Sequence, residues 1–137
     1  TRDSRRLMNK TVLLIEDNEQ NRYLTTFLLE RHGYTVISAP DGLRGIELAR
    51  SSQPDIILLD IQLPTMDGYA VAQALRASEH LSRVPIVAVT SYAMVGDREK
   101  TLAAGCNGYI EKPINPDTFV GEIEQYLSGE HEAKNVS

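Results

Sequence analysis

Three features that many proteins depend on are scarce or absent in this sequence: cysteine, long apolar runs and an excess of basic residues. A single cysteine, Cys106, excludes an internal disulfide and a zinc site built from several thiolates. No run approaches the roughly 20 apolar residues that a membrane span needs, and no signal-peptide pattern opens the chain. Fourteen Lys and Arg stand against nineteen Asp and Glu, a formal net charge of -5. We therefore expect a cytoplasmic protein that binds neither nucleic acid nor membrane.

The length of the chain is typical of one globular domain, and so is its composition. It has 137 residues, of which 42% are hydrophobic and 24% are charged, and it contains no internal repeat. Both ends are polar, so we expect flexible tails over residues 1–9 and 128–137 and an organised domain over residues 10–127. The first segment lacks an initial Met, which leaves two interpretations: a tail whose natural start is Met8, or a linker cut from a longer protein.

Short β-branched runs alternate with helical patterns along the organised region. The strand-like runs are Thr11–Ile15, Thr35–Ser38, Asp55–Leu59, Pro85–Val89 and Gly108–Ile110. The helical stretches are Glu19–His32, Asp41–Ser51, Tyr69–Ala77, Ala93–Ala104 and Pro116–Leu127. Five strands that alternate with five helices through right-handed crossovers predict a doubly wound α/β domain, with a five-stranded parallel sheet and helices on both faces.

The apolar residues of a helical stretch indicate which of its faces packs against the sheet. The first stretch ends at Gly33, a residue typical of helix C-termini. Its apolar residues share one stripe: Tyr23, Leu24, Phe27 and Leu28. The fourth stretch is the weakest helix of the set because it contains Gly96.

Polar side chains gather where the predicted strands end. The first strand is followed by Glu16 and Asp17, and the third by Asp60. The fourth strand ends at Thr90 and Ser91, and the fifth leads to Lys112. The carboxyl ends of parallel strands meet at one edge of a sheet, which is where ligands bind in folds of this class. Clustered carboxylates repel one another unless a cation lies among them, and acids on short turns suit Mg²⁺.

A carboxylate beside such a metal ion can attack phosphorus and form an aspartyl phosphate. Thr90 and Lys112 would then hold the phosphoryl oxygens, one by a hydrogen bond and one by its charge. Each of these residues also has a purely structural interpretation. Asp17 or Asn18 would cap the helix that follows, and Thr90 would be an ordinary strand residue.

Four segments carry the strongest functional signal when they are taken together. They are Ile15–Asn18 (IEDN), Leu58–Gly68 (LLDIQLPTMDG), Val87–Ala93 (VAVTSYA) and Ala103–Pro113 (AAGCNGYIEKP). In order and spacing this set resembles the receiver domain of two-component response regulators, in both DivK-type single-domain regulators and hybrid kinases. The resemblance implies a flavodoxin-like sheet with strand order 2-1-3-4-5 and a cis Lys112–Pro113 bond.

The resemblance also implies roles for individual residues. Asp60 is implied as the phosphoacceptor. Mg²⁺, or Mn²⁺ in its place, is implied to bind to Asp17, Asp60 and the backbone carbonyl of Gln62, and through water to Glu16. The implied phosphate-binding and switch residues are Thr90, Ser91, Lys112 and Tyr109. The implied positions that tune dephosphorylation are Gln62 and Tyr92.

As a receiver, the chain is expected to take its phosphoryl group from a histidine kinase or a histidine phosphotransfer protein. Its own histidines, His32, His80 and His131, lie in unrelated places, so the phosphodonor histidine is expected on the partner. The expected output is phosphorylation-dependent protein binding at the face of the fourth helix, fifth strand and fifth helix, with homodimerisation left open. Such a signalling module catalyses only its own phosphorylation and dephosphorylation.

Several alternatives remain at this point. The chain is either a stand-alone regulator or a receiver excised from a hybrid kinase or larger output protein. A phosphatase of the haloacid-dehalogenase type needs a second Asp where this chain has Gln62. A flavodoxin-like FMN carrier needs a phosphate loop where residues 16–19 are acidic or amide side chains. The last alternative is a receiver that serves only as a non-phosphorylated docking module.

Overall fold

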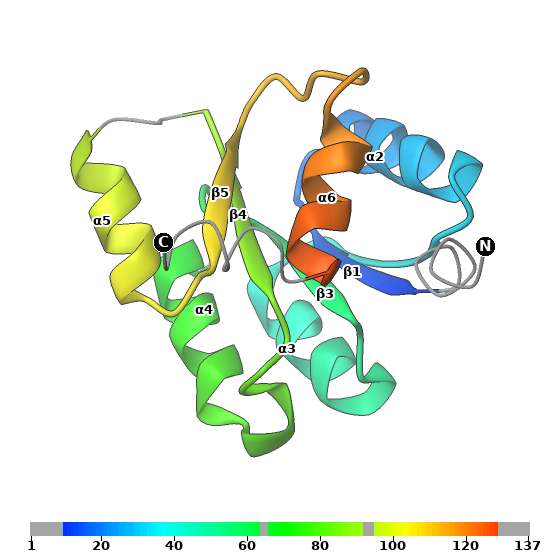
Figure 1. The fold of residues 1–137 in the computed structure, drawn as a ribbon. Helices are drawn as coiled ribbons and strands as arrows, with labels where there is room; N and C mark the ends of the chain where they lie inside the picture. Colours follow the sequence, from blue (N-terminus) through cyan, green and yellow to red (C-terminus); the bar gives the residue numbers. More distant parts are fainter. Residues whose placement is uncertain (1–9, 64–65, 92–94, 129–137) are drawn as a thin grey trace.

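The computed structural model describes residues 10–63, 66–91 and 95–128, which form one parallel sheet of five strands covered by helices (Figure 1). The strands are β1 Thr11–Ile15, β2 Thr35–Ala39, β3 Ile56–Asp60, β4 Ile86–Thr90 and β5 Gly108–Glu111. Their order across the sheet is β2-β1-β3-β4-β5, and each neighbouring pair is parallel. The predicted α/β fold and its strand order are therefore confirmed.

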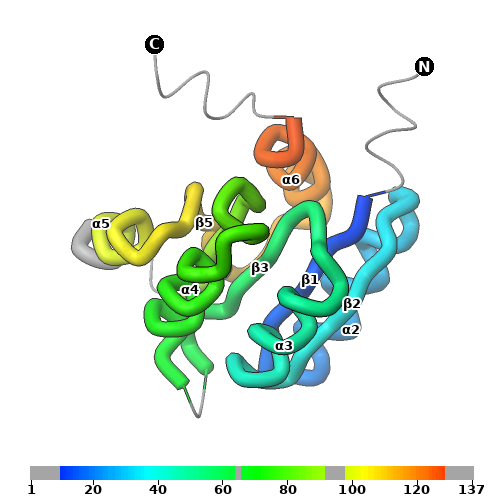
Figure 2. Tube along the Cα trace, turned by 90° about the horizontal axis from the view of Figure 1, so that it is seen from below, coloured from blue at the N-terminus to red at the C-terminus, as the bar shows by residue number. Residues whose placement is uncertain are grey.

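Helices cover both faces of this sheet. They are α2 Glu19–Arg31, α3 Gly42–Ser52, α4 Gly68–Ala77, α5 Val95–Ala103 and α6 Phe119–Ser128, with the short 3-10 helix η1 Glu79–Leu81 before β4. Helices α3 and α4 pack on one face, and α2 and α6 pack on the other. Figure 2 shows α5 apart from these layers, beside the edge strand β5.

The sheet is apolar along its central strands because both of its faces are buried. Leu13 and Ile15 pack with α3 and α4, whereas Val12 and Leu14 pack with α2 and α6. Every residue of β3 and β4 is buried. Full burial of one Leu, Ile or Val side chain contributes about 1.5–3 kcal/mol. The central strands therefore hold the residues at their carboxyl ends firmly in place.

Helix α2 contradicts most of the prediction made from its apolar stripe. Tyr23, Leu24 and Phe27 are 68%, 58% and 48% exposed. The residues of α2 that are buried are Thr25 and Leu29. Leu28, the fourth residue of the stripe, packs against the core. Apolar residues occupy more of the circumference of this helix than the sheet can cover, so periodicity alone did not separate Leu28 from the three exposed residues. The structure leaves an exposed aromatic and aliphatic surface on α2.

Side chains cap the helices that begin near the carboxyl edge of the sheet. Asn18, Asp41 and Asp67 accept hydrogen bonds from backbone N–H groups in the first turns of α2, α3 and α4. Asn18 thus has the predicted capping role, and the Lys112–Pro113 bond is cis, as the resemblance implied. Within the described ranges, every helix is too short or too polar to cross a membrane.

A hydrogen-bonded clamp fixes the start of β5 and so helps to place Lys112, which follows the end of this strand. Arg76 of α4 donates to the carbonyl of Gly105 at 2.8 Å and to Asn107 Oδ1 at 2.6 Å. Asn107 Oδ1 also accepts from the N–H of Ile86 at 2.8 Å, and its own N–H donates to the Ile86 carbonyl at 2.7 Å. These bonds set the register of β5 against β4.

Two helical glycines provide a test of the packing. A Cβ atom at Gly121 would meet nothing within 4 Å, whereas a Cβ at Gly45 would lie 2.5 Å from Ile15 Cδ1. We expect Gly121→Ala to raise the free energy of unfolding by about 0.5–1 kcal/mol, because alanine loses less backbone entropy on folding. Gly45→Ala should lower it by about 1–3 kcal/mol through overpacking. Urea denaturation of both variants would measure the difference, and equal effects would contradict the packing described.

Candidate phosphoacceptor site

Three carboxylates meet at the carboxyl edge of the sheet. Glu16 and Asp17 follow β1, and Asp60 is the last residue of the neighbouring strand β3. One oxygen from each carboxylate lies within 4.8 Å of the other two. Glu16 and Asp60 are each 3% exposed, whereas Asp17 is exposed to solvent. The three acids predicted from their positions at strand ends therefore lie close together in the structure.

An ammonium group bridges the two buried acids. Lys112 Nζ lies 2.9 Å from Glu16 Oε1 and 3.3 Å from Asp60 Oδ2. The backbone N–H of Lys112 donates to the Thr90 carbonyl at 2.8 Å, which attaches this residue to the end of β4. One lysine therefore links the ends of β1, β3 and β4 and offsets part of the repulsion between the carboxylates.

The electrostatics of the site favour a further cation. Burial raises the pKa of Asp60, and its hydrogen bond and charge interaction with Glu16 raise this pKa further. Burial alone would lower the pKa of Lys112, but its hydrogen bonds and charge interactions with the two acids outweigh burial and raise it. Three acids share one ammonium within the cluster, so a divalent ion would complete the neutralisation of charge.

Backbone hydrogen bonds orient the two buried carboxylates. The N–H of Gln62 donates to Asp60 Oδ1 at 2.9 Å, and the N–H of Asn18 donates to Glu16 Oε2 at 3.2 Å. Arg22 of α2 donates through its guanidinium to the Glu16 carbonyl at 2.8 Å. Sequence analysis did not select Arg22, and no sequence pattern marks it, because its partner is a backbone carbonyl.

The remaining residues selected from sequence lie at different distances from the cluster. Thr90 is buried at the end of β4, and Ser91 follows it at the surface. Gln62 is exposed, two residues after Asp60. Tyr109 is half-buried within β5 and lies beside α5 rather than among the acids. Tyr92 falls outside the described residues.

The acidic cluster fits a hard divalent cation. Carboxylate oxygens are the ligands that Mg²⁺ prefers, and it binds through one or two carboxylates while keeping several waters. The cluster offers two buried carboxylates and an exposed one, so an ion could enter from solvent at Asp17. When bound, Mg²⁺ neutralises negative charge on phosphoryl oxygens.

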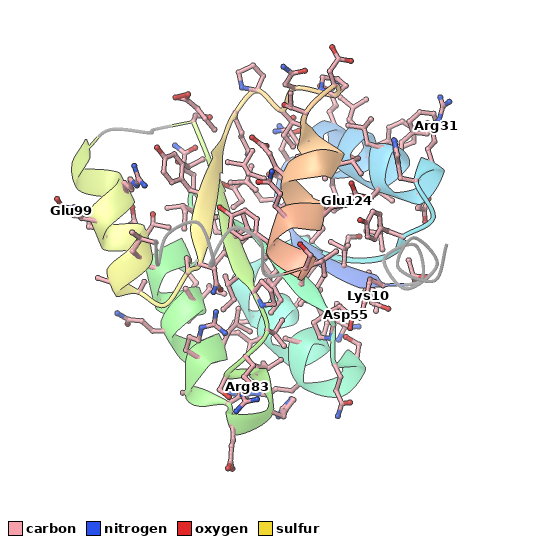
Figure 3. The ribbon with its side chains drawn as sticks, viewed as in Figure 1. Lys10, Arg31, Asp55, Arg83, Glu99 and Glu124 are labelled. Carbon is pink, nitrogen blue, oxygen red and sulfur yellow. The ribbon has the colours of Figure 1, made fainter. Side chains whose placement is uncertain are left out.

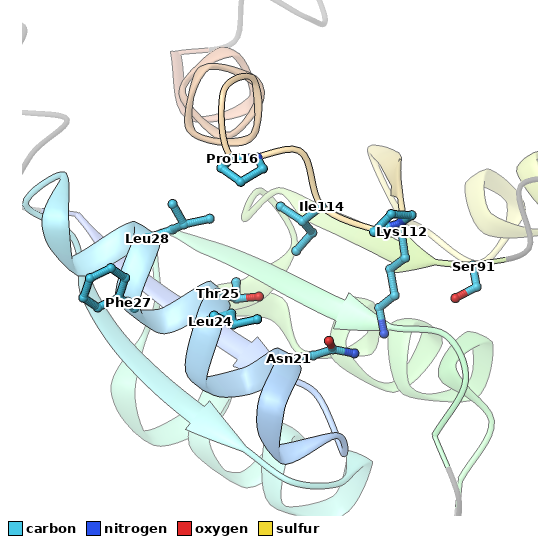
Figure 4. A pocket seen from close by; sticks show the side chains of 10 residues that line it. Asn21, Leu24, Thr25, Phe27, Leu28, Ser91, Lys112, Ile114 and Pro116 are labelled. Atoms are coloured by element: carbon cyan, nitrogen blue, oxygen red, sulfur yellow. The ribbon is translucent and has the colours of Figure 1, made fainter.

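A cavity of about 670 Å³ opens beside this cluster (Figure 4). Its apolar wall includes Leu24, Phe27 and Leu28 of α2 and Ile114 of the loop after β5. Ser91 and Lys112 line it on the side of the site, where the Lys112 side chain extends toward the strand ends (Figure 4). The exposed apolar surface of α2 is therefore continuous with the phosphoacceptor candidate.

Comparisons with known proteins agree with this geometry. The family model of the response regulator receiver domain matches residues 12–124 of the chain. Over 120 residues the chain is 44% identical to the polar-differentiation response regulator DivK of Brucella ovis, which covers 88% of this chain and 98% of that relative. The chain belongs to the response regulator receiver family.

Solved structures support the same assignment. The receiver domain of the sensor histidine kinase PA1611 from Pseudomonas aeruginosa is 37% identical, with a TM-score of 0.80 and coverage of 88% of this chain and 98% of that one. That receiver has a magnesium ion coordinated in its active site cleft. The Vibrio cholerae chemotaxis protein CheY4 is 26% identical, with a TM-score of 0.84 and coverage of 86% and 98%. The chain is thus similar both to a DivK regulator and to a kinase receiver.

Asp17 allows a direct test of cation binding, because removing an exposed carboxylate uncovers no buried charge. We expect Asp17→Asn to weaken Mn²⁺ binding on the order of tenfold, since ligand charge count sets the affinity of such sites. Glu99→Gln is the matched control, because Glu99 lies on α5 away from the cluster (Figure 3). Electron paramagnetic resonance of free Mn²⁺ would measure both affinities. Equal affinities would exclude Asp17 as a ligand.

Proposed function

We propose that this receiver accepts a phosphoryl group on Asp60 from a phosphohistidine of a kinase or phosphotransfer protein. The observation that carries the proposal is the contact of Lys112 Nζ with Asp60 Oδ2 inside the acidic cluster. An oxygen of the Asp60 carboxylate attacks phosphorus, and the P–N bond breaks with its electron pair returning to the imidazole. The product is an acyl phosphate on Asp60 and a free histidine on the donor.

The other residues of the site would hold the transferring group and the metal ion. Asp17 and Asp60 would bind Mg²⁺, with the backbone carbonyl of Gln62 as a further ligand and Glu16 acting through water. Lys112 would hold one phosphoryl oxygen by charge, and Thr90 another by hydrogen bond. Stabilisation of charge by preorganised groups is the main contribution that a protein makes to phosphoryl transfer.

The phosphodonor protein would approach over α2. The histidine of the donor has to reach Asp60, so the donor must contact the surface next to the acidic cluster. That surface includes the cavity beside Lys112 and the exposed apolar side chains Leu24 and Phe27. An apolar patch next to a polar site is typical of protein–protein contact.

The response to phosphorylation would leave the site through β4 and β5. Phosphorylation adds negative charge next to Thr90, which would be drawn inward together with the connection to α5. Tyr109 would then turn, and the face of α5, β5 and α6 would repack for a downstream partner or a second copy. This face is the fourth helix, fifth strand and fifth helix of the family. Gln62 and Tyr92 would tune the loss of phosphate.

Intact mass measurement tests the chemistry. We expect the wild type to gain one phosphoryl group, about 80 Da, on incubation with acetyl phosphate and Mg²⁺, and to gain none in EDTA. Asp60→Asn should gain none under either condition, because an amide oxygen is too weak a nucleophile. A folded wild type that binds Mn²⁺ and stays unmodified with both acetyl phosphate and phosphohistidine donors would indicate a docking module instead.

The approach over α2 is tested by comparing a protein donor with a small one. We expect Phe27→Ala to lower the ratio of the transfer rate from a phosphorylated histidine phosphotransfer domain to the rate from acetyl phosphate by roughly tenfold, the scale of a truncated interface anchor. Leu43→Ala is the matched control, because Leu43 is 66% exposed on α3, away from the cavity. Equal ratios in the two variants would place the donor elsewhere.

A further inference from the structure

The described side chains of helix α5, residues 98–103, are mostly exposed. Among them only Thr101 is buried. The helix packs chiefly against the edge strand β5 rather than on a face of the sheet. Elements with little buried apolar contact open more easily than the core. A single contact between α5 and β5 therefore contributes a large part of the free energy that holds this helix in its position.

One such contact joins Arg98 to Tyr109. The guanidinium carbon of Arg98 lies 5.9 Å from the centre of the Tyr109 ring, within the range of a cation–π interaction. On β5, Tyr109 packs against the same core cluster as α3 and α4. The preceding residue, Gly108, lies against the Tyr126 ring of α6, which leaves no room for a side chain there. Strand β5 is thus fixed from both sides, and Arg98 ties the less buried helix to it.

The same helix is connected directly to the phosphoacceptor site. Strand β4 ends at Thr90, beside Asp60 and Lys112, and α5 begins at Val95. Only residues 91–94 separate the two elements along the chain. We take α5 to leave the position in which Arg98 meets Tyr109 when Thr90 moves toward a phosphoryl group on Asp60.

We propose that Arg98 is a positioning residue that holds α5 docked on Tyr109 and thereby slows phosphorylation of Asp60. The inference rests on the proposed function, because it assumes that phosphorylation displaces Thr90. If Asp60 is phosphorylated from the arrangement in which α5 has left Tyr109, the rate of phosphorylation follows the population of that arrangement, and the contact lowers this population by a factor that its own free energy sets. For an exposed cation–π pair this factor is about two- to fivefold.

Two measurements test the proposal. Arg98→Gln removes the cation, and Lys100→Gln removes the same charge from an exposed position on the same helix. We expect Arg98→Gln to speed hydrogen exchange of the α5 amides about two- to fivefold in the unphosphorylated protein. Phosphorylation by acetyl phosphate should become faster by a similar factor. Lys100→Gln should change neither rate, and Arg98→Lys should retain part of the wild-type behaviour because it keeps the cation.

A Tyr109→Leu background shows whether the ring is the partner. In that background Arg98→Gln should have no further effect on hydrogen exchange. A full effect there, or exchange and phosphorylation rates equal to those of Lys100→Gln in the native background, would overturn the proposal. If the wild type accepts no phosphoryl group, the proposed function fails, and the exchange measurements still decide whether Arg98 holds α5.

Discussion

The ion pairs of Lys112 with Glu16 and Asp60 are the interaction on which this edge of the molecule depends. A parallel sheet brings the carboxyl ends of its strands together, and here two of those ends carry acids that are almost completely buried. Without a nearby ammonium, the charged forms of both acids would be strongly disfavoured. The same lysine is fixed through its backbone to Thr90, so charge balance and strand alignment are joined in one residue.

Keeping the carboxylates of this cluster ionised costs folding free energy. The pKa of Asp60 is raised by burial and by Glu16, which means that the ionised carboxylate is held at a cost in folding free energy. A carboxylate in that condition gains from any positive charge brought to it. Burial and crowding alone therefore favour positive charge at this cluster.

Much of the fold and the centre of the site followed from sequence, because both depend on local patterns. Apolar runs buried on two faces are characteristic of central strands, and acids directly after such runs have to lie at the sheet edge. The sequence predicted a strand that ends at Leu59, with Asp60 directly after it, whereas β3 includes Asp60 as its last residue. Asp60 lies at the carboxyl edge of the sheet in either case. The pattern was wrong on α2, where Tyr23 and Phe27 are exposed while Thr25 is buried. Periodicity shows only where apolar residues lie on a helix. Helix α2 has apolar residues both on the side that packs against the core and on an exposed side, so periodicity does not tell the two sides apart.

Contacts between distant segments could not be derived in this way. Arg22 meets the Glu16 carbonyl, and Arg98 meets the Tyr109 ring, only because tertiary packing brings long flexible side chains to them. Neither arginine occupies a distinctive sequence pattern. The clamp of Arg76 and Asn107 belongs to the same group, since Arg76 of α4 reaches two separate connections, at Val84 before β4 and at Gly105 and Asn107 before β5.

The direction of the chain has a practical consequence for how the molecule can be handled. Strand β1 starts at the amino edge of the sheet, and α6 runs back from the carboxyl edge to finish at Ser128 on that same amino side (Figure 1). Lys10, which lies at the start of β1 near Asp55, marks the same region (Figure 3). A fluorophore, a sensor chip or another polypeptide joined at Lys10 or at Ser128 would be attached on the amino side of the sheet. The opposite edge, with its carboxylates, would remain accessible to a partner protein.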